Sequence, residues 1–330
     1  AGAAGAAARM LLTGERVDTV ALDTLKGVRL VLDILDAQTG DGWARCAVRK
    51  DAGDDPDVTD GMLVCVTAQK AECGIAVEGG EGVGRVTKPG LDQPVGAAAI
   101  NSVPRQMIRE QVEAVCRDAG YSGGIRVVVS VPGGAEIAKR TFNPRLGIEG
   151  GVSIIGTTGI VEPMSSAALT ETIRLELRVL RASGAEAVLL CPGNYAETFS
   201  RETLGLSVRP VSVSNFIGEA IDAAVAEGFR RILLVGHLGK LVKLGIGMMN
   251  THSACGDGRM ETLAACALEA GGDLALLKRI MACATTDAAV ATLHEAGLLD
   301  GTMDVLGGRI QSTLQRRAPA GIEIGFICYT

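Results

Sequence analysis

Apolar and polar residues alternate along much of the first ~130 residues, which is the pattern of strands that bury one face of a sheet. A helical pattern interrupts the alternation over 104–119, and the alanine-rich opening over 1–12 also predicts a helix rather than a signal peptide. We therefore expect an α+β domain whose mixed or antiparallel sheet carries helices on one face. The expected strands are 28–34, 44–48, 62–67 and 125–131.

From residue 150 the pattern changes to strand, loop and helix in repetition. Right-handed crossovers would assemble such strands into a parallel sheet, which predicts a Rossmann-like, doubly wound α/β domain. The carboxyl ends of its strands lie at one edge, where open α/β folds bind ligands. The expected strands are 152–155, 187–191, 211–213 and 232–235, and the tail from Arg259 is expected to be helical and to end in a strand over 322–328.

Small polar residues follow each of these strands, and the glycine-threonine loop from Gly156 to Gly159 leads into a long amphipathic helix. Glycine lets a backbone approach a ligand closely, although many such turns bind nothing. Neither G-x-G-x-x-G nor a P-loop motif is present. The ligand-binding residues that we predict at this edge are Gly156, Thr157, Thr158, Gly159, Gly193, Asn194, Ser214, Asn215, Gly236 and His237.

The length of 330 residues suggests two domains, which the change of pattern places at 1–149 and 150–330. Nine cysteines without a C-x-x-C pair are typical of reduced thiols in the cytoplasm, and with only three histidines we expect no metal site. No apolar run approaches the ~20 residues of a membrane-spanning helix. The net charge of −6 argues against nucleic acid as a partner.

Charge is unevenly spread along the chain. Residues 50–81 hold eight acids and two bases, and the aspartates of 51–60 would either hold a hard cation or, as we expect, cap turns. Residues 85–145 hold nine bases and five acids, which suits recognition of carboxylates or phosphates, or else a solvated surface with ion pairs. The candidate anion-binding residues are Lys88, Arg105, Lys139, Arg140 and Arg145.

Long motifs of this chain resemble, in the same order, those of the cobalt-precorrin-5B methyltransferase (CbiD) family of anaerobic cobalamin synthesis. The resemblance implies transfer of a methyl group from S-adenosylmethionine to carbon 1 of cobalt-precorrin-5B, which gives cobalt-precorrin-6A and S-adenosylhomocysteine. The family's Thr-Thr-Gly-x-Cys motif before the alanine-rich helix is absent here. The motifs are KDAGDDPDVTDG, GEGVGRVTKPGL, VPGGAEIAKRTFNPRLGIEGGVSIIGTTGIVEPMS, PGNYAETF, SNFIGEAID and ILLVGHLGKLVKLGIGMMNTHSACGDGRMETLA.

The resemblance also gives the predicted sites their ligands. The sheet edge would bind S-adenosylmethionine, and the basic residues of 85–145 would bind the carboxylates of the cobalt-containing tetrapyrrole. Positioning alone can drive methyl transfer, and His237 and Asp54 are candidates for any proton transfer. The alternatives are a phosphoryl-transfer enzyme that uses the glycine loop and a non-catalytic tetrapyrrole carrier. A homodimer is compatible with the sequence; a membrane is not an expected partner.

Overall fold

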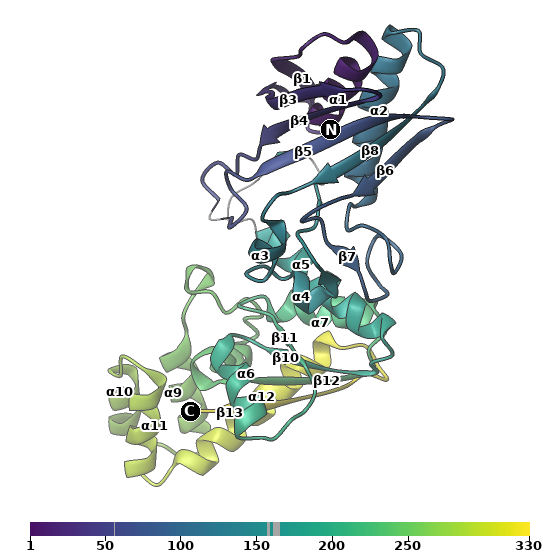
Figure 1. Cartoon of the computed structure of the whole chain (residues 1–330). Coiled ribbons are helices and arrows are strands. Elements are labelled where there is room, and N and C mark those ends of the chain that lie inside the picture. Colours follow the sequence, from purple (N-terminus) through teal and green to yellow (C-terminus); the bar gives the residue numbers. More distant parts are fainter. Residues whose placement is uncertain (56, 157–158, 161–165) are drawn as a thin grey trace. The chain divides into compact units, whose positions relative to one another are not determined.

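The computed structural model describes residues 1–55, 57–156, 159–160 and 166–330. The chain divides into two compact units, Ala1–Ser165 and Ser166–Thr330, and each unit has a hydrophobic core of its own. Both α-helices and strands occur in each unit, so the fold is mixed α/β (Figure 1). No helix in the described ranges has both the length and the apolar character needed to cross a membrane.

A five-stranded mixed sheet forms the centre of the first unit. Four of its strands are antiparallel neighbours and the last pairs in parallel. Its order is β3 (Leu35–Gly40), β4 (Trp43–Arg49), β5 (Leu63–Ala71), β8 (Gly124–Ser130) and β6 (Ile75–Gly79). Helices α1 (Gly2–Thr13) and α2 (Ser102–Asp118) pack against each other, α1 also against β4 and β5 and α2 against β6. The predicted helices and the mixed sheet are therefore confirmed.

Short elements complete the first unit. A hairpin of β1 (Thr19–Asp23) and β2 (Arg29–Asp33) lies beside α1. Strand β7 (Arg85–Val86) pairs with β9 (Ile148–Glu149), and α3 (Gly134–Ala138) and α4 (Asn143–Leu146) lie between β8 and β9 in the chain.

The predicted strand 152–155 belongs to this first unit and not to the parallel sheet, so that prediction is wrong. Val152 forms a bridge with Val83, and Ile154 forms one with Ile100. The approach is close because Gly151 packs directly on the backbone of Gly82, where any side chain would collide. The apolar segment 152–155 therefore pairs with residues that precede it in the chain and not with the strands that follow it.

A four-stranded parallel sheet forms the centre of the second unit. Three of its strands are those predicted, and the fourth is the C-terminal strand of the chain, which takes the place that the sequence analysis gave to 152–155. The order is β11 (Pro210–Ser212), β10 (Ala187–Cys191), β12 (Arg231–His237) and β13 (Glu323–Tyr329) (Figure 1).

Helices cover both faces of this sheet. On one face α6 (Asn194–Glu202) packs against Leu189, Cys191 and Val235. The main core lies on the other face, where α5 (Ser166–Ala182), α7 (Ile217–Ala226) and α12 (Leu299–Arg317) contribute apolar residues. The remaining helices are α8 (Leu238–Leu241), η1 (Val242–Ile246), η2 (Ser253–Cys255), α9 (Arg259–Glu269), α10 (Leu274–Met281) and α11 (Thr286–Glu295).

Candidate functional site

The order of the strands creates a topological switch point in the second unit, between β10 and β12. From β10 the chain crosses to β11 on one side, and afterwards β12 and β13 are added on the other side. Loops that leave β10 and β12 at their carboxyl ends therefore diverge, and open α/β folds bind ligands at such a switch point. Gly193 and Asn194 follow β10, whereas Gly236 and His237 are the last residues of β12.

The predicted site residues are only partly brought together. Ser214 and Asn215 follow β11, so they join the residues that follow β10 and β12 at one edge of the sheet. Gly156 and Gly159 lie in the first unit and do not follow a strand of the parallel sheet. Thr157 and Thr158 lie outside the described residues.

Gly193 has a backbone conformation that other residues rarely adopt. Its φ of 110° and ψ of 162° fall in a region that is essentially restricted to glycine. It is the N-cap residue of α6, and no side chain caps this helix end. The first N–H groups of α6 therefore lack a side-chain acceptor and carry the positive end of the helix dipole.

Lys240, which the sequence analysis did not select, links these loops. Its Nζ donates a hydrogen bond to the carbonyl oxygen of Ser214 at 3.1 Å. The same Nζ lies 3.9 Å from the position that a Cβ atom on Gly193 would occupy. Burial lowers the pKa of Lys240, and the charge of Lys243 lowers it further. A half-buried ammonium group therefore lies beside the loops that follow β10 and β11.

Hydrogen bonds from Thr251 hold the loop that follows β11. Thr251 donates to Asn215 twice, from its N–H to the backbone oxygen at 3.0 Å and from its hydroxyl to Oδ1 at 3.2 Å. Lys243 is 4% exposed, and its Nζ donates to the carbonyl oxygens of Thr251 (3.2 Å) and Gly256 (2.8 Å). These bonds fix Asn215 at the edge of the sheet.

His237 caps the helix that follows its strand. Its Nδ1 accepts a hydrogen bond from the N–H of Gly239 at 3.1 Å, so the neutral ring carries its hydrogen on Nε2. That Nε2 lies 3.7 Å from Oδ1 of Asp287. With its Nδ1 lone pair occupied, the Nε2–H of His237 offers a hydrogen-bond donor.

Tyr329, at the end of β13, adds an aromatic group to the same edge. Its ring stacks on Phe199 of α6 with centroids 4.0 Å apart, and the ring of His237 meets it edge-on at 5.5 Å. Burial raises the pKa of Tyr329, and the thiols of Cys191 and Cys328 raise it further, so the hydroxyl stays protonated. This hydroxyl is buried and has no hydrogen-bond partner among the described residues.

If a bound ligand forms a hydrogen bond with this hydroxyl, Tyr329→Phe should weaken ligand binding without destabilising the fold. An unsatisfied buried polar group costs about 1–3 kcal/mol, so the ligand-free variant should melt at the same or a higher temperature than the wild type. Its affinity for S-adenosylhomocysteine, the kind of ligand that the resemblance implies for this edge, should fall several-fold in calorimetry. Tyr195→Phe is the control, because Tyr195 is 87% exposed. A lower melting temperature with unchanged affinity would show that the hydroxyl serves the fold.

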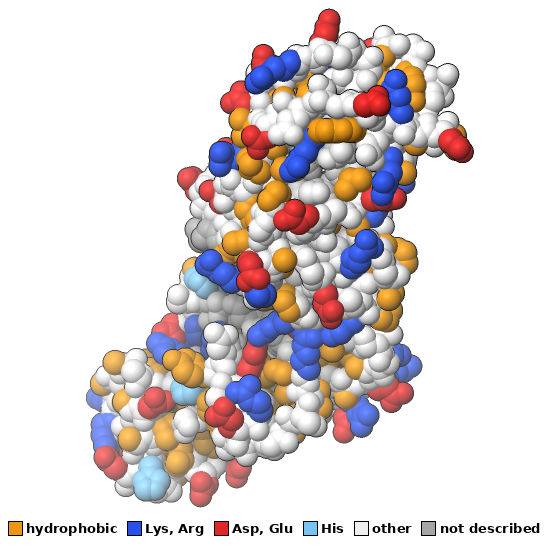
Figure 2. All heavy atoms as spheres, in the orientation of Figure 1, with side chains coloured by type: hydrophobic (Ala, Val, Ile, Leu, Met, Phe, Trp, Pro, Cys, Tyr) orange, Lys and Arg blue, Asp and Glu red, His pale blue; other side chains and the backbone are white. Residues whose placement is uncertain are grey.

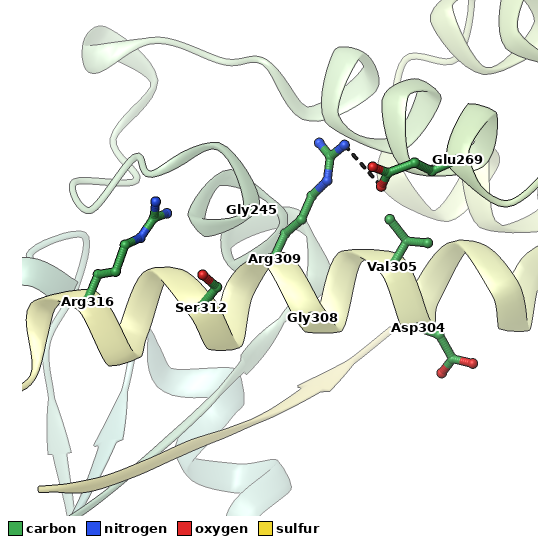
Figure 3. A pocket seen from close by; sticks show the side chains of 8 residues that line it. All are labelled: Gly245, Glu269, Asp304, Val305, Gly308, Arg309, Ser312 and Arg316. Atoms are coloured by element: carbon green, nitrogen blue, oxygen red, sulfur yellow. Dashed lines mark hydrogen bonds and ion pairs between the residues drawn. The ribbon is translucent and has the colours of Figure 1, made fainter. Parts of the chain in front are cut away.

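Among the cavities that the described residues form, one apolar and one more polar cavity lie in the second unit. An apolar cavity of 370 Å³ opens beside the end of β13, and it includes Leu238, Met303, Phe326 and Tyr329 among its lining residues. Figure 3 shows the second, a cavity of 520 Å³ that is lined by α12, η1 and α9 and not by the loops at the strand ends. There Arg309 pairs with Glu269 at 3.2 Å.

The basic residues predicted to bind anions lie in the first unit and differ in their environments. Arg105 donates to the backbone oxygens of Val77 (2.6 Å), Ile100 (2.7 Å) and Ala98 (3.2 Å), so its guanidinium supports the fold. On the face shown in Figure 2, side chains of both signs are interspersed. Lys139 is exposed and pairs with Glu136, Arg140 and Arg145 are exposed, and the stem of Lys88 lies against Gly147.

The aspartates of 51–60 accept hydrogen bonds from the backbone of their own loop. Oδ1 of Asp51 accepts from Gly53 and Oδ1 of Asp60 from Ala52, each at 2.8 Å. Asp57 pairs with Lys50. In the ranges that the structure describes, no three side chains of the metal-binding kinds come together. Asp54 is exposed in this loop.

Comparison with known proteins gives consistent matches. The sequence model CbiD matches residues 1–163, and the model CbiD, C-terminal domain, matches residues 250–330. A cobalt-precorrin-5B C(1)-methyltransferase of Ruminiclostridium cellulolyticum is 47% identical over 100% of this chain and 86% of its own length. One of a Thermoanaerobacter species is 46% identical over 90% and 81%, respectively. The crystal structure of cobalamin biosynthesis protein CbiD from Archaeoglobus fulgidus is 29% identical, with a TM-score of 0.39 over 76% of this chain and 78% of that one.

Proposed function

The chain belongs to the CbiD family, and we propose that its second unit binds the methyl donor, S-adenosylmethionine, at the carboxyl edge of the parallel sheet. The chain is a methyltransferase that acts on carbon 1 of cobalt-precorrin-5B, as the names of its relatives state. One observation carries the methyl-donor site: Gly193 and Lys240 flank the switch point between β10 and β12. We accordingly interpret the second unit as Rossmann-like and doubly wound.

The groups at this edge fit the chemistry of S-adenosylmethionine. Its ribose hydroxyls and amino-acid portion need hydrogen-bond donors and acceptors, which Asn215, His237 and the unpartnered hydroxyl of Tyr329 supply. Its adenine needs an apolar wall, and the 370 Å³ cavity beside β13 provides one. Whether Gly156, Thr157, Thr158 and Gly159 add to the site stays a prediction.

We assign the tetrapyrrole to the first unit. A precorrin is a flat apolar ring with acetate and propionate groups at its rim, so its site needs positive charge. Lys88, Lys139, Arg140 and Arg145 are the candidates that remain once Arg105 is assigned to the fold. The division of roles follows the two units: substrate in the first and methyl donor in the second.

A test of this assignment is Arg145→Ala. We expect the affinity for the cobalt precorrin to fall at least several-fold, because a charge-assisted contact contributes ~1.5 to 3 kcal/mol once the bound tetrapyrrole shelters this exposed residue from water. The affinity for S-adenosylhomocysteine should stay unchanged, since Arg145 lies in the first unit. Equal losses of both affinities in a calorimetric titration would contradict the assignment and indicate a defect of folding.

Methyl transfer from a sulfonium depends more on the orientation of the reacting atoms than on proton transfer. Bound S-adenosylmethionine supplies a methyl group that is already activated on a sulfonium. The residues of the sheet edge then hold the reacting atoms in line, and orientation of this kind is worth about 7–11 kcal/mol of the barrier. A general base typically adds a factor of about 10² to 10⁴. His237, whose Nδ1 is occupied by a helix cap, acts in this scheme as a hydrogen-bond donor.

An assay of methyl transfer distinguishes a methyltransferase from a protein that only carries the tetrapyrrole. Incubation of the anaerobically prepared protein with cobalt-precorrin-5B and methyl-labelled S-adenosylmethionine should place the label on carbon 1 over many turnovers. A carrier would bind the tetrapyrrole and transfer nothing. We further propose a cytoplasmic protein, in keeping with nine free thiols, and a homodimer, for which β13 offers the edge of a sheet.

A further inference from the structure

Among the described residues, the ammonium group of Lys240 donates a hydrogen bond to one acceptor, the carbonyl oxygen of Ser214, and further N–H donors remain available. A lysine offers three N–H donors, and the contact with the carbonyl oxygen of Ser214 uses one. Within the described residues, the only charge that perturbs Lys240 noticeably is the like charge of Lys243. Burial without a carboxylate partner is costly for a cation, so a negatively charged ligand would find a favourable place beside it.

Gly193 places no side chain beside this ammonium. A Cβ atom there would come within 3.9 Å of Nζ, and glycine leaves that position empty. Behind it begins α6, a nine-residue helix whose N-terminus has no side-chain cap. An anion beside Gly193 would therefore be close to the ammonium of Lys240 and to the start of α6, whose first turn already carries Glu197, and the ammonium favours a carboxylate.

We propose that Lys240 binds the carboxylate of the methionine portion of S-adenosylmethionine and thereby selects methyl donors that retain their amino-acid group. The proposal rests on the proposed function, because it places the methyl donor at this edge. Ser214 holds the lysine in position through its carbonyl oxygen. The carboxylates of the tetrapyrrole have the same chemistry, so the test must separate the two sources.

The test compares two ligands that differ only in the amino-acid group. S-adenosylhomocysteine carries the carboxylate, whereas 5′-methylthioadenosine lacks the whole amino-acid portion. In calorimetric titrations Lys240→Met should weaken binding of S-adenosylhomocysteine by at least tenfold and leave binding of 5′-methylthioadenosine within twofold. Lys240→Arg, which keeps the charge, should retain most of the preference for S-adenosylhomocysteine. Lys278→Met is the control, because Lys278 is an exposed residue of α10, and neither affinity should change.

Each other outcome overturns a defined part of the account. Equal losses for both ligands would show that Lys240 merely shapes the loops, and an unchanged affinity for S-adenosylhomocysteine would remove it from the site. A loss of affinity for the cobalt precorrin alone would assign Lys240 to the substrate. Failure of the wild type to bind either ligand would contradict the proposed methyl-donor site itself. If Lys240→Met does not fold, as judged by its melting curve, Lys240→Gln provides the same comparison.

Discussion

Replacement of Gly193 by valine should lower the affinity for S-adenosylhomocysteine by more than tenfold. Two causes act together. The φ of 110° strains any other residue by about 1–3 kcal/mol, and a valine side chain would extend into the space before Lys240. Titration calorimetry on the purified variant measures the loss.

Gly205→Val is the matched control. Gly205 also has a positive φ, of 63°, but its Cβ position faces open space after α6. This variant should lose stability through strain and keep its affinity. If Gly193→Val bound S-adenosylhomocysteine as tightly as the wild type, the methyl donor would not bind at the switch point between β10 and β12.

Replacement of Arg105 by alanine should lower the free energy of unfolding by about 3 kcal/mol or more, because several hydrogen bonds from a charged group are lost at once. The guanidinium joins α2 to the backbone oxygens of Val77, Ala98 and Ile100. Urea denaturation measures the change. The affinity of the folded variant for the cobalt precorrin should stay within twofold of the wild type.

Arg109→Ala, on the same helix, is the control for Arg105. Arg109 is exposed, so its removal should change the free energy of unfolding by about 0.5 kcal/mol or less. A stable Arg105→Ala protein that had lost precorrin affinity would restore Arg105 to the substrate site, as the sequence analysis first placed it.

The local pattern of the sequence predicted most of the secondary structure. Alternation and helical periodicity located α1, α2, β4, β8 and the strands of the second unit to within a few residues. The pattern could not show which strands pair, because the apolar residues of a strand indicate that it is buried but not which strand lies beside it. For this reason residues 152–155 were expected in the parallel sheet, although they pair with Val83 and Ile100. Strand β13 was not expected there, although it is the fourth strand of that sheet.

The same limit explains why the sequence did not indicate Lys240 and Tyr329 as candidates. Lys240 gains its position from the carbonyl oxygen of Ser214, a contact that exists only once β10, β11 and β12 are ordered. Tyr329 joins His237 because β13 lies next to β12. The sequence could not show the backbone contacts of Arg105, because an arginine in a basic segment has the same signature whether it binds backbone oxygens or a ligand carboxylate.

The central claim is that the methyl donor binds at the carboxyl edge of the parallel sheet, and a crystal structure with S-adenosylhomocysteine tests it most directly. The account predicts density for the ligand in contact with Gly193, Asn215 and Lys240, with its carboxylate at the ammonium of Lys240. A ligand bound wholly within the first unit, with these residues untouched, would contradict it.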